Sequence, residues 1–234
     1  MWVERIEQLR AKLDVSTEKV SRVDFGAGLR AETGARGDAE MAGGVQVEDE
    51  VQRISRSSSK SGLWALFLFK LIRGLRPRHC LEMGTALGLS GAYQAAALQL
   101  NGYSSFTSLE GSAELAAIAR RNWESLGLRD ARVIVGRFAD TLGGVLAAEP
   151  MDYVFIDGHH DEAATLDYFE RLSPKLASPA CLVFDDITWS AGMRHAWRVV
   201  TEDARVKVSV DFGPVGVAIV GALDRRRPAR APLA

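Results

Sequence analysis

Residues 79–90, which read HCLEMGTALGLS, are the stretch that decides the fold. The apolar run up to Met83 predicts a buried strand, and Ser90 begins a predicted helix. Two glycines, Gly84 and Gly88, lie in the turn between them. Glycine lets the backbone approach a ligand closely, and the first turn of a helix presents free N–H groups. The stretch therefore predicts a strand, a turn and a helix, with a ligand bound at the turn.

Short apolar runs and helical periods alternate along most of the chain after this unit. The predicted strands are 79–83, 105–109, 132–135, 153–156 and 181–184, and the predicted helices are 90–100, 113–126, 163–172 and 191–201. This alternation is typical of an α/β fold with a mainly parallel sheet and helices on both faces. Residues 206–211 and 216–221 flank the turn FGPV and predict a terminal hairpin.

The composition limits the size of the protein and the class of its partner. The chain has 234 residues, of which 47% are hydrophobic and 25% charged, which predicts one main domain with a small appendage. The formal net charge of −1 argues against a nucleic-acid partner, which needs a strongly basic surface. We expect a small-molecule partner.

Several features predict a protein of the cytoplasm without a membrane partner. The N-terminus lacks the apolar stretch of a signal peptide. The most apolar stretch, 63–72, is about half the length needed to cross a bilayer, and Lys70 interrupts it. Cys80 and Cys181 each open an apolar run, which favours buried thiols over a disulfide or a metal pair.

The N-terminal region is expected to be a small appendage. Trp2, Ile6, Leu9 and Leu13 recur at helical spacing and predict an amphipathic helix, which could pack on the core or on a second copy, so a homodimer is an open expectation. Residues 24–44 are rich in glycine, alanine and charge and predict a loop or flap. We therefore divide the chain into residues 1–56, an N-terminal helix with a flexible cap; 57–223, the main domain; and 224–234, a disordered basic tail.

The carboxyl ends of parallel strands are where an open α/β sheet binds its ligands. Glu110 ends the second predicted strand, about twenty residues after Gly88, where a carboxylate can accept both hydroxyls of a ribose. Together with Glu82 and the glycine turn, it predicts a cofactor that contains adenosine. The alternative is that Glu82 and Glu110 only cap turns.

A second glycine motif competes with this turn. Residues 26–31, GAGLRA, fit the dinucleotide-binding pattern G-x-G-x-x-A. The preceding residues are only weakly strand-like, and the following residues, ETGARGDAE, do not predict the helix that would hold a pyrophosphate. We interpret this motif as part of a flap near the site.

Three aspartates follow the fourth and fifth predicted strands. Asp157, Asp185 and Asp186 converge if these strands are neighbours, and a divalent cation such as Mg²⁺ would relieve their repulsion. Successive residues of a strand point to opposite faces, so both Asp185 and Asp186 can reach one ion only if the strand has ended. The alternative is that Asp186 caps the next helix and no metal binds.

His160 is a candidate general base. It stands three residues after Asp157, and histidine is the side chain that most often removes a proton near neutral pH. The alternative is a histidine in a surface loop.

Five motifs together resemble those of the class I S-adenosylmethionine-dependent methyltransferases. They are LEMGTALGLSG (81–91), SLEG (108–111), VIVGRFADTL (133–142), VFIDGHH (154–160) and LVFDDITW (182–189). The chain is similar in particular to methyltransferase family 24 and to the catechol and caffeoyl-CoA type O-methyltransferases, over about residues 61–221. The resemblance implies a Rossmann-like fold whose seven-stranded, mainly parallel sheet has an antiparallel last strand.

The resemblance also implies roles for individual residues. It places Glu82, Gly84, Thr85, Gly88 and Ser90 at the methionine end of S-adenosylmethionine, Glu110 at the ribose, Gly136 and Phe138 at the adenine, and Asp157, Asp185 and Asp186 at a metal, with Asp157 also near the cofactor. Two positions depart from the catechol type, which usually has asparagine in place of Asp186 and lysine in place of His160. Family 24 often has histidine at the latter position, so we place the chain nearer that group.

The predicted function is methyl transfer from S-adenosylmethionine to a hydroxyl of a small molecule. A divalent metal would acidify the hydroxyl, and His160, assisted by Asp157, would take its proton. The N-terminal region up to Arg56 has no clear counterpart in the catechol type, so we expect substrate selection there. The alternatives are a metal-independent N- or O-methyltransferase, a protein that binds the cofactor without chemistry, and a nicotinamide dehydrogenase.

Overall fold

The computed structural model describes residues 1–26, 41, 43–102 and 105–221. Most of the predicted flap, all of the second glycine motif except Gly26, and the predicted tail 224–234 lie outside the described residues.

Seven strands form one sheet in the order β5-β4-β3-β6-β7-β9-β8. They are β3 (His79–Met83), β4 (Ser105–Glu110), β5 (Ala131–Val135), β6 (Met151–Ile156), β7 (Leu176–Phe184), β8 (Val206–Asp211) and β9 (Gly216–Val220). The strands β3 to β7 pair in parallel, whereas β9 is antiparallel to both β7 and β8. The predicted seven-stranded sheet with a reversed last strand is confirmed.

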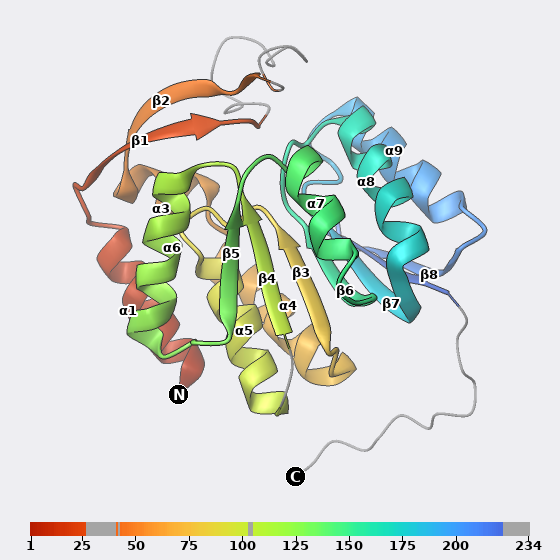
Figure 1. Cartoon of the computed structure of the whole chain (residues 1–234), viewed down its shortest axis with the longest axis horizontal. Coiled ribbons are helices and arrows are strands. Elements are labelled where there is room, and N and C mark those ends of the chain that lie inside the picture. Colours follow the sequence, from red (N-terminus) through yellow and green to blue (C-terminus); the bar gives the residue numbers. More distant parts are fainter. Residues whose placement is uncertain (27–40, 42, 103–104, 222–234) are drawn as a thin grey trace.

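Helices cover both faces of the sheet (Figure 1). They are α4 (Gly62–Leu75), α5 (Leu89–Asn101) and α6 (Ala113–Leu126) on one face, and α7 (Phe138–Leu146), α8 (Glu162–Leu172) and α9 (Ala191–Glu202) on the other, with a short 3₁₀ helix, η1 (Ser173–Lys175), after α8. Each face of the sheet has its own hydrophobic core, and consecutive residues of a strand point into opposite ones. Cys80 packs with α4 to α6, and Leu81 packs with α7 to α9. Because the central strands β3, β6 and β7 are buried on both sides towards their carboxyl ends, these parts read as mainly apolar runs.

One helix and one strand of the main domain differ from the prediction. Helix α7 is absent from the prediction because its sequence, FADTLGGVL, contains two adjacent glycines of low helix propensity. Its four buried side chains, Phe138, Leu142, Val145 and Leu146, supply packing that outweighs this propensity. Strand β7 begins five residues before the predicted residue 181, since Leu176 already pairs with Met151.

The predicted N-terminal helix is α1 (Trp2–Leu13), and it packs on the core of its own chain. Ile6 is fully buried, the Tyr93 hydroxyl donates to Glu7 Oε1 at 2.7 Å, and Arg5 donates to the carbonyl of Leu126 at 2.7 Å. The helix is thereby attached to α5 and α6. The homodimer stays a prediction.

A separate two-stranded ribbon follows α1. It consists of β1 (Lys19–Asp24) and β2 (Val45–Glu50), which pair antiparallel and lead into α3 (Val51–Ser58). Figure 1 shows the ribbon beyond the carboxyl ends of β4 and β5, next to the start of α6. The sequence of β1 is only weakly strand-like. Its strand conformation depends on pairing with β2, whose residues are more than twenty positions away in the chain.

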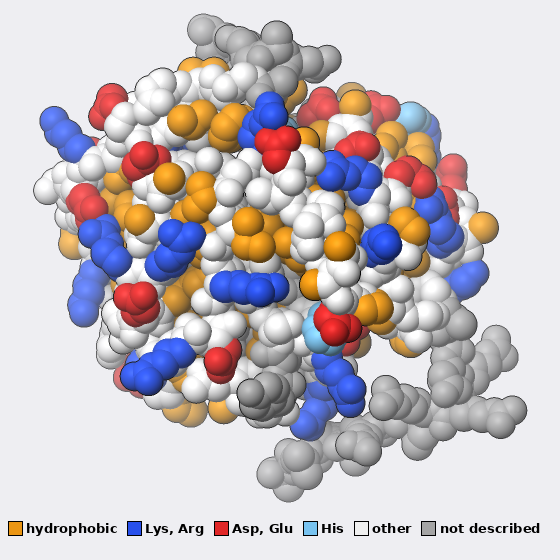
Figure 2. All heavy atoms as spheres, viewed as in Figure 1, with side chains coloured by type: hydrophobic (Ala, Val, Ile, Leu, Met, Phe, Trp, Pro, Cys, Tyr) orange, Lys and Arg blue, Asp and Glu red, His pale blue; other side chains and the backbone are white. Residues whose placement is uncertain are grey.

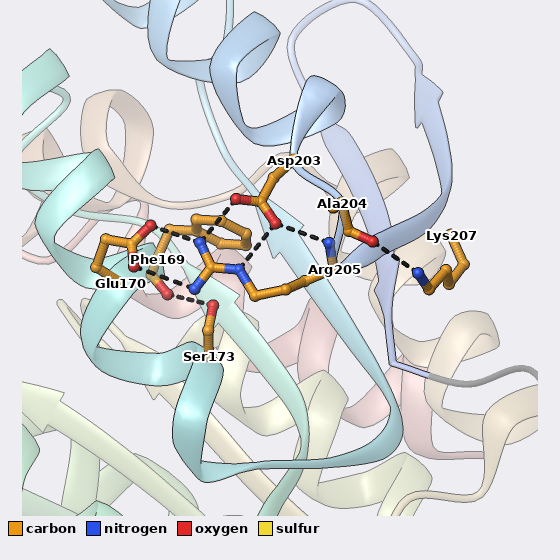
Figure 3. A network of polar contacts seen from close by, with 7 residues as sticks. All are labelled: Phe169, Glu170, Ser173, Asp203, Ala204, Arg205 and Lys207. Atoms are coloured by element: carbon orange, nitrogen blue, oxygen red, sulfur yellow. Dashed lines mark hydrogen bonds and ion pairs between the residues drawn. The ribbon is translucent and has the colours of Figure 1, made fainter.

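Arg205 fastens the far edge of the sheet (Figure 3). Its guanidinium donates to Asp203 Oδ1 at 2.8 Å and to Glu170 Oε2 at 3.1 Å. It also lies 4.7 Å from the ring centroid of Phe169. The turn that precedes β8 is thus tied to α8.

The surface carries both signs of charge. On the face seen in Figure 2, basic and acidic side chains are interspersed over the helices. Within the described part of the chain, no helix has the length and apolar character needed to span a membrane.

Candidate active site

A cavity of about 290 Å³ lies at the carboxyl ends of the central strands. The ribbon and the two residues after β1 line one part of it through residues 22–26. The end of α3 and the segment that follows line another part through residues 57–60. The sheet contributes the turns after β3, β4, β6 and β7. The cavity therefore lies where the strand order predicts a ligand.

The turn after β3 requires glycine at its first position. Gly84 has φ +109°, and a Cβ atom there would lie 1.9 Å from the carbonyl oxygen of Asp157. The Gly84 N–H donates to the carbonyl of Leu109 at 3.0 Å, which fixes the turn against β4. Helix α5 consequently begins at the cavity, where Ser90 belongs to the lining.

Glu110 stands at the end of β4 and lines the cavity. Its carboxylate accepts the backbone N–H of Ala86 at 2.8 Å and that of Ser112 at 2.9 Å. Burial raises the pKa of Glu110 above its ordinary value, although these N–H groups act in the opposite direction. A fixed acceptor thus faces the space beside the glycine turn.

Some predicted cofactor residues line the cavity, and others support it from behind. The lining includes Gly84, Thr85, Ser90, Glu110, Phe138 and Asp157, whereas Glu82, Gly88 and Gly136 lie outside it. Trp123 packs against Gly88 and leaves no room for a side chain there, because a Cβ would lie 2.7 Å from the Trp123 Nε1. At Gly136, φ is +142° and a Cβ would lie 2.8 Å from Thr141.

Glu82 is fully buried beneath α5. It accepts hydrogen bonds from Gln94 Nε2 and Ser108 Oγ, each at 2.7 Å. Burial raises its pKa to about 8. Its contacts hold α5 and β4 together, and direct contact of Glu82 with a cofactor stays a prediction.

Phe138 forms an aromatic wall of the cavity. Its ring centroid lies 5.6 Å from that of His159 and 5.9 Å from that of Tyr168, both in edge-to-face arrangement. The Tyr168 hydroxyl and His159 Nδ1 are hydrogen-bonded at 2.6 Å. Through Phe138 and His159 this cluster gives the cavity an aromatic wall.

The three predicted aspartates border the same cavity as His160. Strands β6 and β7 are neighbours and end level with each other, with Ile156 opposite Phe184. Asp186 has φ +52°, so strand β7 has ended before it. The side chains of Asp185 and Asp186 are therefore not forced to opposite faces of the sheet. Burial raises the pKa of Asp185 to about 7, with the charge of Asp157 adding to the effect.

His160 lies between two of these carboxylates. Its Nε2 is 3.8 Å from Asp157 Oδ1 and 3.8 Å from Asp186 Oδ2. Burial lowers the pKa of His160, although the negative charges of Asp186 and Asp185 act in the opposite direction. The neutral imidazole, which can accept a proton, is therefore favoured near neutral pH.

Lys60 extends into the centre of this acidic group. Its Nζ is paired with Asp185 Oδ2 and lies 3.8 Å from Asp157 Oδ2. Only 16% of the Lys60 side chain and 1% of the Asp185 side chain are exposed. Burial alone would lower the pKa of Lys60, but the charges of Asp157, Asp185 and Asp186 outweigh burial and raise it.

The side chains as placed do not fit a divalent cation. Such an ion needs several oxygen ligands around one point, and the described residues contain no cluster of three or more His, Cys, Asp or Glu side chains that could hold a metal. The Lys60 ammonium lies between the two carboxylates that would be the first ligands. We therefore assign no chemical step to a metal.

Residues 81–187 match the family model described as a methyltransferase domain, and this range contains the glycine turn, Glu110, His160 and the three aspartates. Over these residues the chain is similar to that methyltransferase domain. The family resemblance predicted from the five motifs is confirmed.

Proteins similar to this chain agree with the match. A catechol O-methyltransferase from Niastella koreensis is 28% identical over 150 residues, which cover 59% of this chain and 66% of the relative. The aligned part thus spans just under two thirds of that relative. An O-methyltransferase from Bacillus cereus, solved in complex with S-adenosylhomocysteine, is 26% identical with a TM-score of 0.59, covering 69% of this chain and 82% of that one.

A further solved structure shows the same fold. It is an O-methyltransferase from Streptomyces achromogenes involved in tomaymycin synthesis, solved in complex with S-adenosylmethionine. Its TM-score is 0.62 at 22% identity, and the match covers 71% of this chain and 83% of that chain.

Two residues of the candidate site were not predicted from the sequence. Lys60 is preceded by a run of serines that reads as a polar linker, and its partner Asp185 is 125 residues away. Phe25 lies against Gly111, where a Cβ would be 2.5 Å from the ring, and only the folded ribbon brings the two together. Neither residue belongs to a motif, so no signal in the sequence marked them.

Proposed function

We propose that this methyltransferase transfers the methyl group of S-adenosylmethionine to a hydroxyl oxygen of a small molecule. The observation that carries the proposal is one cavity with a glycine turn and Glu110 on one side and His160 among acidic groups on the other. The relatives support it, because those named above are O-methyltransferases and two of them were solved with this cofactor or its product.

The residues around the glycine turn suit the cofactor. The backbone of Gly84 and Thr85 and the side chain of Ser90 would hold the methionine end, close to the first N–H groups of α5. Glu110 would accept the ribose hydroxyls, and Phe138 would lie against the adenine. When bound, S-adenosylmethionine supplies an electrophilic methyl group on a positively charged sulfur.

His160 would act on the acceptor. Its Nε2 accepts the hydroxyl proton, and the resulting imidazolium is stabilised by Asp157 and Asp186, each 3.8 Å away. Asp157 joins the two halves of the cavity, because its carbonyl contacts the glycine turn and its carboxylate faces His160. Holding the acceptor oxygen in line with the methyl group supplies most of the acceleration.

The cofactor site is tested by calorimetric titration with S-adenosylhomocysteine. We expect the wild-type protein to bind it, and Glu110→Ala to raise the dissociation constant about 10- to 100-fold, since hydrogen bonds to a charged acceptor contribute roughly 1.5–3 kcal/mol. Glu124→Ala, at an exposed position on α6, is the matched control. Equal affinity of Glu110→Ala and wild type would contradict the assignment of the ribose site.

A further inference from the structure

The ammonium of Lys60 occupies the point where the strand ends would direct a metal. It approaches from outside the sheet, between the last residue of α3 and the first residue of α4. Both helices are anchored in the core, α3 by Ile54 and α4 by Ala65 and Leu68. The position of Lys60 is therefore set by two packed helices on either side of it.

We propose that Lys60 takes the place of a divalent cation at the acceptor subsite, so that methyl transfer by this protein needs no metal. The inference rests on the proposed function for its chemistry. The structure supports it through the burial of the Lys60–Asp185 pair and through the second carboxylate, Asp157, at 3.8 Å. A positive charge fixed there compensates the acidic group, which is otherwise the task of the ion.

The Lys60 ammonium can also donate a hydrogen bond to the substrate. An ammonium carries three N–H groups, and Asp185 and Asp157 account for two directions. Lys60 lines the cavity, so the third N–H can donate to the acceptor oxygen. That bond lowers the pKa of the hydroxyl and strengthens as negative charge develops on the oxygen.

The step balances without a further reactant. The acceptor oxygen forms the new O–C bond while the C–S bond breaks, and that electron pair stays on sulfur, which becomes the neutral thioether. The hydroxyl proton passes to Nε2 of His160. Lys60 keeps its protons throughout and acts by charge and hydrogen bonding alone.

The first test measures activity against a panel of catechols and other small hydroxyl compounds. We expect excess EDTA to leave wild-type activity unchanged, and Lys60→Ala to lower kcat about 10²-fold or more with little change in S-adenosylhomocysteine affinity. Lys60→Arg keeps the charge and should retain more activity than Lys60→Ala. Lys70→Ala, at an exposed position on α4, is the matched control.

The second test does not depend on turnover. The intact wild-type protein and Lys60→Ala are titrated with Mn²⁺ alone, followed by water-proton relaxation. We expect binding only in Lys60→Ala, because removal of the ammonium leaves the aspartates free to hold the ion. Thermal melts establish that both proteins are folded.

The outcomes separate the two proposals. Wild-type protein that binds Mn²⁺ as well as Lys60→Ala does, or that is inactivated by EDTA and restored by Mg²⁺, would overturn the role of Lys60. Wild-type protein that binds S-adenosylhomocysteine but methylates none of the acceptors would contradict the proposed function. In that case the Mn²⁺ titration still decides whether Lys60 replaces an ion.

Discussion

Glu82 shows how a residue of a binding motif can act from beneath the site. It was predicted at the methionine end of the cofactor, yet its carboxyl group is buried among Gln94 and Ser108. Through those partners Glu82, on β3, connects α5 and β4, and β3 and α5 are the two elements that flank the glycine turn. A carboxyl group with a pKa of about 8 keeps its proton at neutral pH and can both donate and accept there.

The buried proton makes stability depend on pH. Between the ordinary pKa of 4.5 and about 8, the folded protein keeps the Glu82 proton, whereas the unfolded chain releases it. The contribution of Glu82 to the free energy of unfolding therefore falls by about 1.4 kcal/mol per pH unit as pH rises through this window. Outside the window this contribution does not change with pH.

The variant Glu82→Gln has no such proton, so its unfolding free energy should fall less steeply between pH 5 and 8. Urea denaturation at a series of pH values measures both slopes. The exposed Glu124→Gln should behave like the wild type. Parallel slopes for Glu82→Gln and wild type would show that Glu82 is ionised in the folded protein.

At the scale of elements, the turn between β3 and α5 carries the tightest constraint. A methyl group on Gly84 would overlap the Asp157 carbonyl at a φ that side chains rarely adopt. Gly143, inside α7, has nothing within 4 Å of an added Cβ. The same substitution should therefore have opposite effects at the two positions.

We expect Gly84→Ala to lower the free energy of unfolding by roughly 3 kcal/mol or more, because backbone must move to admit the methyl group. Gly143→Ala should raise it by up to about 1 kcal/mol, since alanine favours a helix interior. Chemical denaturation of the two variants measures both. A Gly84→Ala protein as stable as wild type would mean that the turn can shift without cost.

Elements whose apolar residues repeat at strand or helix spacing were predictable from the sequence. Strand β3 and helix α6 have the predicted bounds, because apolar runs and helical periods record burial directly. Asp157 and Glu110 were identified because strand ends fix where side chains meet. The ribbon and Lys60 were not, since both depend on partners far away in the chain.

At the scale of the whole molecule, the site and the far edge of the sheet are separate. The cavity is lined by residues 22–26, Ile54, residues 57–60 and the segments after the strand ends, up to Trp189. The Arg205 contacts in Figure 3 involve α8 and the turn before β8, and none of these residues lines the cavity. Changes at Arg205 should affect stability without changing ligand affinity.

We expect Arg205→Ala to cost about 1 kcal/mol, chiefly from the lost contact with Phe169, and to lower Tm by roughly 2–4 °C. The dissociation constant of S-adenosylhomocysteine should stay the same. Calorimetric melts and titrations measure the two quantities, with the exposed Arg198→Ala as control. A large loss of affinity would show that the sheet edge and the cavity are coupled.

The order of the last two strands also bears on how the protein is made. Of the seven strands of the sheet, β9 is synthesised last, yet it lies between β7 and β8. Until it emerges, the nine-residue strand β7 has an open edge and β8 has no partner in the sheet. Open strand edges are where nascent chains aggregate. The interval before β9 is synthesised is therefore when the edge of β7 is open to pairing with another chain.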